Sequence, residues 1–135
     1  MTRWILSFAI GIANVGTSAH THHSISAVYD SSRQVTIEGV VTQFQFVNPH
    51  PLVMMDVTDG GGNAQQWRLE MDNRSELAEI GVTTETLKPG DRIVVTGSLA
   101  RAQSHSLYIL TLDRHADGFR YEQVGSRPRI RAPSR

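Results

Sequence analysis

Residues 34–58 read QVTIEGVVTQFQFVNPHPLVMMDVT and predict a long β-strand, a proline-flanked corner and a second strand. Val35 and Ile37 lie on one face of the first strand, whereas Val40, Phe44 and Phe46 fall on the other face. The phase therefore changes near Gly39, and a glycine at a phase change is typical of a bulge or a sharp bend. A long first strand that bends can serve two sheets, as a small closed barrel requires.

The order of the other elements indicates the fold. Alternating apolar residues predict five strands, over residues 34–47, 52–58, 65–71, 92–99 and 106–113. Asn73 as N-cap, Glu76 three residues later and Gly81 as C-cap predict one short helix between strands three and four. This layout is that of an OB-fold. We therefore predict a mainly β chain, a small five- to six-stranded OB-fold-like barrel. The alternative is another small barrel or an open β-roll.

The N-terminus has the pattern of a secretory signal peptide. Arg3 supplies a short positive region, residues 4–15 are mostly apolar, and Thr17-Ser18-Ala19 offers small residues where a signal peptidase cuts. The apolar run is too short to span a bilayer, so we expect no transmembrane segment after cleavage. We predict cleavage after Ala19 and a mature protein in the periplasm or outside the cell.

Removal of residues 1–19 leaves one small domain. We expect an N-terminal arm over residues 20–33, a barrel over residues 34–124, and a disordered tail over residues 125–135 with four Arg and two Pro. Basic and acidic residues number 13 each, so no global charge points to nucleic acid or to a membrane surface. The absence of Cys excludes disulfides, Cys-ligated metal centres and a Cys nucleophile.

The corner of the opening stretch carries a histidine on a stiff backbone. Pro49 and Pro51 flank His50 and restrict the backbone on both sides of it. A rigid imidazole of this kind suits a ligand or metal contact, and the alternative is a polar turn residue without a further role.

Cleavage after Ala19 would place His20-Thr21-His22-His23 at the mature N-terminus. The free amine, two amides and the imidazole of His22 would then form a square-planar nitrogen site for Cu(II) or Ni(II). Alternatively, the amine and imidazole of His20 chelate copper and His50 completes the site. A third arrangement binds zinc through His22 or His23 together with His50 and a carboxylate. We favour copper, and the alternative is that the histidine-rich start is a solvated tail.

Other chemistry finds less support in the sequence. Ser24 and Ser106 lie near histidines but not in a nucleophile elbow, and no glycine loop has the pattern of a phosphate cradle. Strands two and three offer only Trp67 for stacking on bases, so we expect no nucleic-acid partner. Asp56 and Glu70 could join a site or pair with Arg68 or Arg92 on the surface. The histidines that we expect to be surface residues are His105 and His115.

Several motifs together resemble a bacterial family of small exported proteins classed as a domain of unknown function. The motifs are His22-His23-Ser24, Tyr29-Asp30, residues 35–41 (VTIEGVV), Asn48-Pro49-His50, residues 87–91 (LKPGD) and Val95-Thr96-Gly97. The resemblance covers residues 22–120, implies a small β-barrel outside the cytoplasm, and directs attention to His22, His23 and His50. It implies no established activity. The chain departs from the family pattern in the two residues before the His-His pair and in the helix region, residues 72–81.

The sequence thus predicts an exported binding module with a possible copper, zinc or nickel ion on His20, His22, His23 and His50. The alternative is a non-catalytic structural or interaction protein of the cell envelope with a protein partner. A metal-dependent enzyme comes third, because no catalytic residue set is evident.

Overall fold

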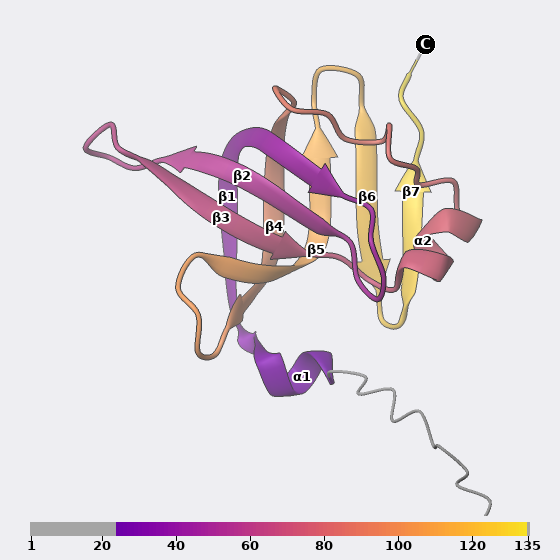
Figure 1. Ribbon diagram of the computed structural model, residues 1–135, viewed down its shortest axis with the longest axis horizontal. Coiled ribbons are helices and arrows are strands. Elements are labelled where there is room, and N and C mark those ends of the chain that lie inside the picture. Colours follow the sequence, from indigo (N-terminus) through magenta and orange to yellow (C-terminus); the bar gives the residue numbers. More distant parts are fainter. Residues whose placement is uncertain (1–23, 135) are drawn as a thin grey trace, which may run out of the picture.

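The computed structural model describes residues 24–134 and has a mainly β fold with two short helices (Figure 1). The predicted signal peptide and the predicted ligands His20, His22 and His23 lie outside these residues. The elements in chain order are α1 (Ile25–Val28), β1 (Tyr29–Gln45), β2 (Leu52–Thr58), β3 (Ala64–Glu70), α2 (Arg74–Glu79), β4 (Arg92–Ala100), β5 (Ser106–Arg114), β6 (Phe119–Val124) and β7 (Arg127–Arg131). No helix within the described part of the chain is long and apolar enough to span a bilayer.

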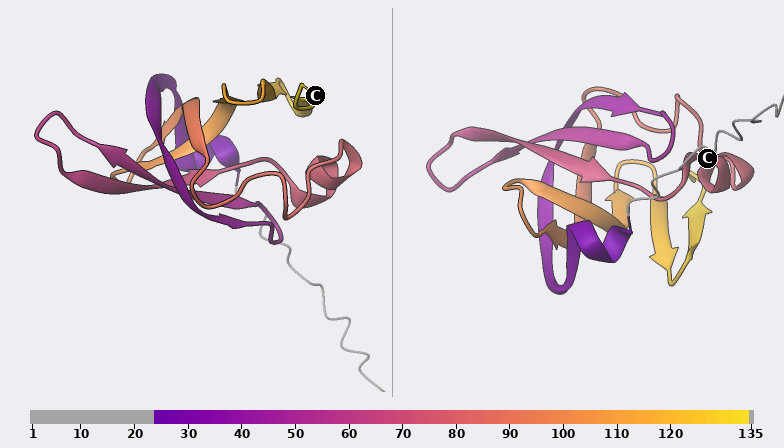
Figure 2. Two further views of the ribbon diagram at one scale, coloured as in Figure 1. Left: turned by 90° about the horizontal axis from the view of Figure 1, so that it is seen from above. Right: turned by 60° about the horizontal axis from the view of Figure 1, so that its bottom comes forward.

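The seven strands form one sheet in the order β3-β2-β1-β4-β5-β6-β7, and all of these neighbours are antiparallel. β3 also pairs with β5 in parallel, with Glu70 opposite Tyr108. The hydrogen-bonded neighbours therefore run in a circuit from β1 through β2, β3, β5 and β4 back to β1. The hairpin of β6 and β7 continues the sheet beyond this circuit (Figure 2). The parallel pairing matters for the site because it joins the end of β3 to the start of β5.

β1 is longer than predicted, and its irregularity lies a few residues after Gly39. It begins at Tyr29 instead of Gln34, so the end of the predicted arm is already strand. The register with β2 shifts between Val41 and Gln43, next to the predicted position near Gly39. Gly39 is needed for another reason, because a Cβ there would collide with the carbonyl oxygen of Asp56 on β2.

The core confirms most of the predicted apolar faces. Val53 and Met55 of β2 and Leu69 of β3 are fully buried, as the alternating pattern predicts. α2 covers the core with Leu77. Its N-terminus is capped as predicted, since the Asn73 side chain accepts a 2.8 Å hydrogen bond from the backbone nitrogen of Ser75. The helix ends before Gly81, which has a φ of 99°.

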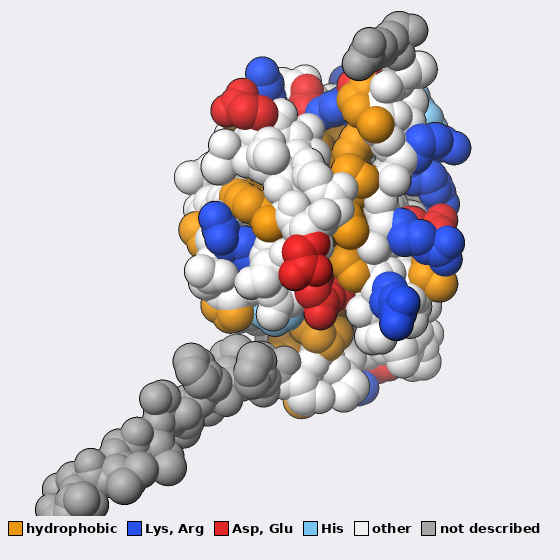
Figure 3. All heavy atoms as spheres, turned by 90° about the vertical axis from the view of Figure 1, so that its right-hand side faces the viewer, with side chains coloured by type: hydrophobic (Ala, Val, Ile, Leu, Met, Phe, Trp, Pro, Cys, Tyr) orange, Lys and Arg blue, Asp and Glu red, His pale blue; other side chains and the backbone are white. Residues whose placement is uncertain are grey.

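The predicted disordered tail is wrong for residues 127–131, which form β7 on the edge of the sheet. The side chains of this strand alternate: Pro128 is buried and Ile130 packs against the core, whereas the three arginines are exposed. Only two residues of the segment face the core. The arginines on either side of them make this alternation hard to recognise in the sequence. Figure 3 views the molecule from the side of β7 and α2, where basic side chains gather beside a strip of hydrophobic ones.

A partly buried ion cluster joins the end of β5 and the turn after it to the segment before β4. The guanidinium of Arg114 lies 2.7 Å from Asp91 Oδ2 and 2.9 Å from Asp117 Oδ2, and it donates a 2.7 Å hydrogen bond to the carbonyl of Thr86. Hydrogen bonding to Arg114 lowers the pKa of Asp117, and the same bond raises the pKa of Arg114. The side chain of Arg114 is only 13% exposed, so these contacts are partly shielded from water.

Replacing Arg114 by glutamine is expected to lower the free energy of unfolding by about 2 kcal/mol near neutral pH, because charge-assisted hydrogen bonds are lost. Since the folded pKa of Asp117 is lowered, the part of this stabilisation that comes from Asp117 is complete above the unfolded pKa, roughly 3.9, and disappears as the pH falls through the folded pKa. Urea unfolding of both proteins from pH 7 downward measures the difference. A difference that stays constant into strong acid would contradict the assignment.

Candidate functional site

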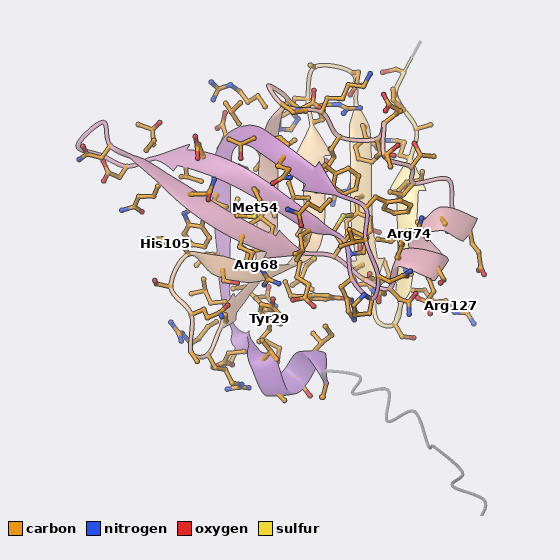
Figure 4. All side chains as sticks on the ribbon, in the orientation of Figure 1. Tyr29, Met54, Arg68, Arg74, His105 and Arg127 are labelled. Carbon is orange, nitrogen blue, oxygen red and sulfur yellow. The ribbon has the colours of Figure 1, made fainter. Side chains whose placement is uncertain are left out.

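The Asn48-Pro49-His50-Pro51 corner joins β1 to β2, and the chain after β3 holds it in place. The backbone nitrogens of Met71 and Arg74 donate 3.0 Å hydrogen bonds to the carbonyls of Pro51 and Pro49. The Arg74 side chain at the start of α2 reaches back to the same region (Figure 4). Its Nε donates a 3.0 Å hydrogen bond to the carbonyl of Phe46, and its guanidinium lies 4.6 Å from the centre of the Phe46 ring. Backbone and side-chain contacts thus add to the rigidity that the two prolines give the corner.

The His50 imidazole has a defined orientation. Its Nδ1 lies 2.9 Å from the carbonyl oxygen of Met71. Because a carbonyl oxygen only accepts hydrogen bonds, this contact requires the proton on Nδ1, and the neutral ring then has its lone pair on Nε2. Nε2 makes no hydrogen bond within the described residues, and the side chain is 15% exposed. The corner therefore presents a single basic nitrogen from a fixed ring.

Glu70, at the end of β3, lies beside this histidine. Its Oε1 is 3.9 Å from His50 Nδ1, and its Oε2 accepts a 2.5 Å hydrogen bond from the Tyr29 hydroxyl. Arg68 Nη1 is 3.7 Å from the same oxygen. The sequence leaves open whether Glu70 joins a site or pairs with Arg68. In the structure, Glu70 lies close to both His50 and Arg68. The carboxylate, only 13% exposed, links the corner to the start of β1.

Tyr29 is the site residue that sequence reasoning misses. Burial and the hydrogen bond to Glu70, together with the charge of Glu70, raise the pKa of Tyr29 to about 12. Its ring centre lies 5.8 Å from that of Tyr108 on β5. The buried Ser106 hydroxyl at the start of β5 acts in the opposite direction and lowers the pKa of Tyr29. The sequence signals for Tyr29 are its aromatic side chain within the predicted arm and the Tyr29-Asp30 motif of the family resemblance.

The other acidic candidate, Asp56, does not join His50. It lines a separate groove with Glu38 and Arg92. The predicted pairing of Arg92 with an acid of the neighbouring strands is met by Glu38, at 3.3 Å, instead of Asp56. The prediction that His105 and His115 are surface residues is confirmed, since both are exposed. The His105 ring stands edge-on to Trp67 at 5.2 Å between ring centres.

Residues 24–134 contain no cluster of three or more His, Asp or Glu side chains that could hold a metal ion. His50 and Glu70 supply two such groups, with Glu70 on the Nδ1 side of the ring. The remaining predicted ligands, His20, His22 and His23, precede the described residues. The described chain begins at Ser24, directly before α1. In Figure 1, α1 and the β1–β2 corner both lie to the right of the tip of the β2–β3 hairpin, and the right-hand view of Figure 2 shows a separation between α1 and the corner.

Comparison with known proteins gives a family but no activity. A family model described as a family of unknown function (DUF6152) matches residues 10–108, which include the corner, Tyr29 and Glu70. No curated protein matches the chain.

Proposed function

This chain belongs to a family of unknown function, and from its own residues we propose that it binds a divalent transition metal, with copper favoured. The ligands in this proposal are His50 and the N-terminal histidines His20, His22 and His23. One observation carries the proposal: His50 Nδ1 is 2.9 Å from the Met71 carbonyl, which leaves Nε2 free as a ligand.

The contact to Met71 matches the usual support of a metal-binding histidine. Such a histidine nearly always donates its other ring N–H to a carbonyl or a carboxylate, which fixes the ring and raises the basicity of the ligating nitrogen. Here the carbonyl is that of Met71, and the carboxylate of Glu70 lies 3.9 Å from the same nitrogen. The negative charge of Glu70 would also offset part of the charge of a bound cation.

The ligand types suit copper, which we favour, but do not exclude other metals. Imidazoles together with a free amine and deprotonated amides suit Cu(II), and they also suit Ni(II). Zinc remains the alternative, with Glu70 as the obvious candidate for the carboxylate in a His-rich site. In each arrangement His50 is the rigid ligand and the N-terminal residues are brought to it.

We also propose a fold and a cellular location for this protein. The circuit of β1, β2, β3, β5 and β4, with α2 between β3 and β4, supports an OB-fold-like barrel. The signal-peptide pattern of residues 1–19 supports export to the periplasm or beyond. The mature protein would then meet its metal outside the cytoplasm.

Replacing His50 by alanine is expected to weaken Cu(II) binding at least about ten-fold, which corresponds to about 1.4 kcal/mol. Calorimetric titration of the mature protein, after mass spectrometry has identified its N-terminus, measures this effect. His105→Ala is the matched control, because His105 is exposed and contacts Trp67 instead of Glu70.

Three results of this titration would count against the proposal as stated. Wild-type protein that binds copper no tighter than about 10 μM would exclude a specific site. Equal affinity of wild type and His50→Ala would reduce the site to the N-terminal peptide. Absence of binding would favour the second candidate, an envelope interaction protein. That candidate is supported by the exposed arginines of β7, which are Arg127, Arg129 and Arg131.

A further inference from the structure

A groove of ≈ 540 Å³ lies between α1, β3 and the loop that joins β4 to β5. Five of its lining residues are aliphatic and two carry a guanidinium: Ile25, Ala27, Val28, Ala100, Ala102, Arg68 and Arg101. Its volume falls in the range of small-molecule sites, which are mostly apolar with a few polar groups that fix orientation. Glu70, which lies beside His50, also lines this groove.

The guanidinium of Arg68 retains unused hydrogen-bonding capacity. Among residues 24–134, its one acidic contact is Nη1 to Glu70 Oε2 at 3.7 Å, which is too long for a hydrogen bond. That oxygen already accepts the 2.5 Å hydrogen bond of Tyr29. The Arg68 side chain is 40% exposed, and Figure 4 shows Arg68 and Tyr29 in the space between β3 and α1.

Arg101 is held in place but also keeps free donors. Its Nη1 lies 3.3 Å from Asp30 Oδ2, and its Nε donates a 3.3 Å hydrogen bond to the carbonyl of Ser26. A guanidinium has five N–H donors, so these two contacts leave several of them available. The bond to Ser26 fixes the side chain against α1, and half of the side chain remains exposed, at 50%.

We propose that this groove binds an amphipathic organic anion, a carboxylate with an apolar tail. The carboxylate would accept hydrogen bonds from Arg68 and Arg101, for which a carboxylate has the matching geometry. The tail would cover the apolar side chains of α1 and of the β4–β5 loop. Glu70 is the acidic side chain among the lining residues, and it accepts the hydrogen bond of Tyr29. The two arginines outnumber it, which gives the groove its affinity for anions. This binding does not require the metal proposed for His50.

The test uses decanoate and the uncharged 1-decanol, which has the same tail, with the mature protein labelled for NMR. We expect decanoate to shift the amide signals of α1 and of residues 100–103, and to bind more tightly than decanol. Arg68→Gln and Arg101→Gln should each weaken decanoate binding at least about five-fold, because a charge-assisted hydrogen bond is lost, and should leave decanol binding unchanged. Arg92→Gln is the matched control, because Arg92 pairs with Glu38 in another groove.

The outcomes decide between the alternatives. Decanoate that binds no better than decanol, shifts that lie elsewhere, or arginine variants that titrate like wild type would each overturn the proposal. Arg101→Gln keeps the test decisive even where Arg68→Gln perturbs folding, since Arg101 lies on an exposed loop. Decanoate binding that is unchanged in His50→Ala would separate this groove from the metal site, whatever copper does.

Discussion

Replacing Tyr29 by alanine is expected to lower the free energy of unfolding by about 4 kcal/mol, as for other buried aromatic side chains. Tyr29 is 2% exposed and packs with Ala100 and Tyr108 in a cluster that also holds α1 on the sheet. Its hydroxyl also donates the 2.5 Å hydrogen bond to Glu70. The substitution therefore removes a packed ring and one partner of a poorly exposed carboxylate. Urea unfolding followed by circular dichroism measures the change.

Tyr29→Phe separates the two contributions, because it keeps the ring and removes only the hydroxyl. We expect it to cost about 1–2 kcal/mol, the usual loss of a hydrogen bond to a charged group. Arg68 and His50 remain beside Glu70 in this variant. If Tyr29→Ala and Tyr29→Phe were equally stable, the ring would contribute nothing and the described packing of α1 would be wrong.

Replacing Gly97 by alanine is expected to cost about 3 kcal/mol or more, because the added Cβ overlaps atoms that have little freedom to move. Gly97 lies in β4 opposite β5, where the register between the two strands shifts. A Cβ at this position would collide with the backbone carbonyl oxygen of Tyr108 and with the side chain of Leu107, which is fully buried. Thermal and urea unfolding of the variant measure the loss.

Gly60→Ala is the matched control for this substitution. Gly60 lies in the turn between β2 and β3, and an added Cβ there meets no heavy atom within 4 Å. We expect a change within about 0.5 kcal/mol, as for most surface substitutions. Equal losses in the two variants would show that the cost does not arise from the close approach of β4 to β5.

Those parts of the fold that depend on local periodicity could be predicted from the sequence. Alternation predicted β2 to β5, and cap residues predicted α2 to within two residues at either end. β7 was missed because Pro128 and Ile130 are its only inward-facing residues, too few to be recognised among arginines. The early start of β1 was missed because Tyr29 and Asp30 pair with β4 across a register shift. Local patterns do not report such long-range pairing.

The candidate site, like the fold, could be predicted from the sequence only in part. The proline-flanked His50 stands out in the sequence because its stiffness is local. The contacts of Glu70 do not, since its hydrogen bond to Tyr29 joins residues 41 positions apart. That bond brings together the start of β1 and the end of β3, and β3 ends where it pairs in parallel with β5. The tautomer of His50 likewise follows from the Met71 carbonyl, 21 positions away.

The central claim is that His50 binds a metal through Nε2 while Nδ1 stays on the Met71 carbonyl. Two-bond ¹H–¹⁵N NMR of the mature protein, labelled with ¹⁵N-histidine, tests it most directly. We predict the Nδ1–H tautomer of His50 in metal-free protein, and selective broadening of the His50 signals by less than one equivalent of Cu(II). His105 and His115 should remain sharp at the same copper level. An Nε2–H tautomer, or His50 signals that one equivalent of copper leaves unchanged, would contradict the claim.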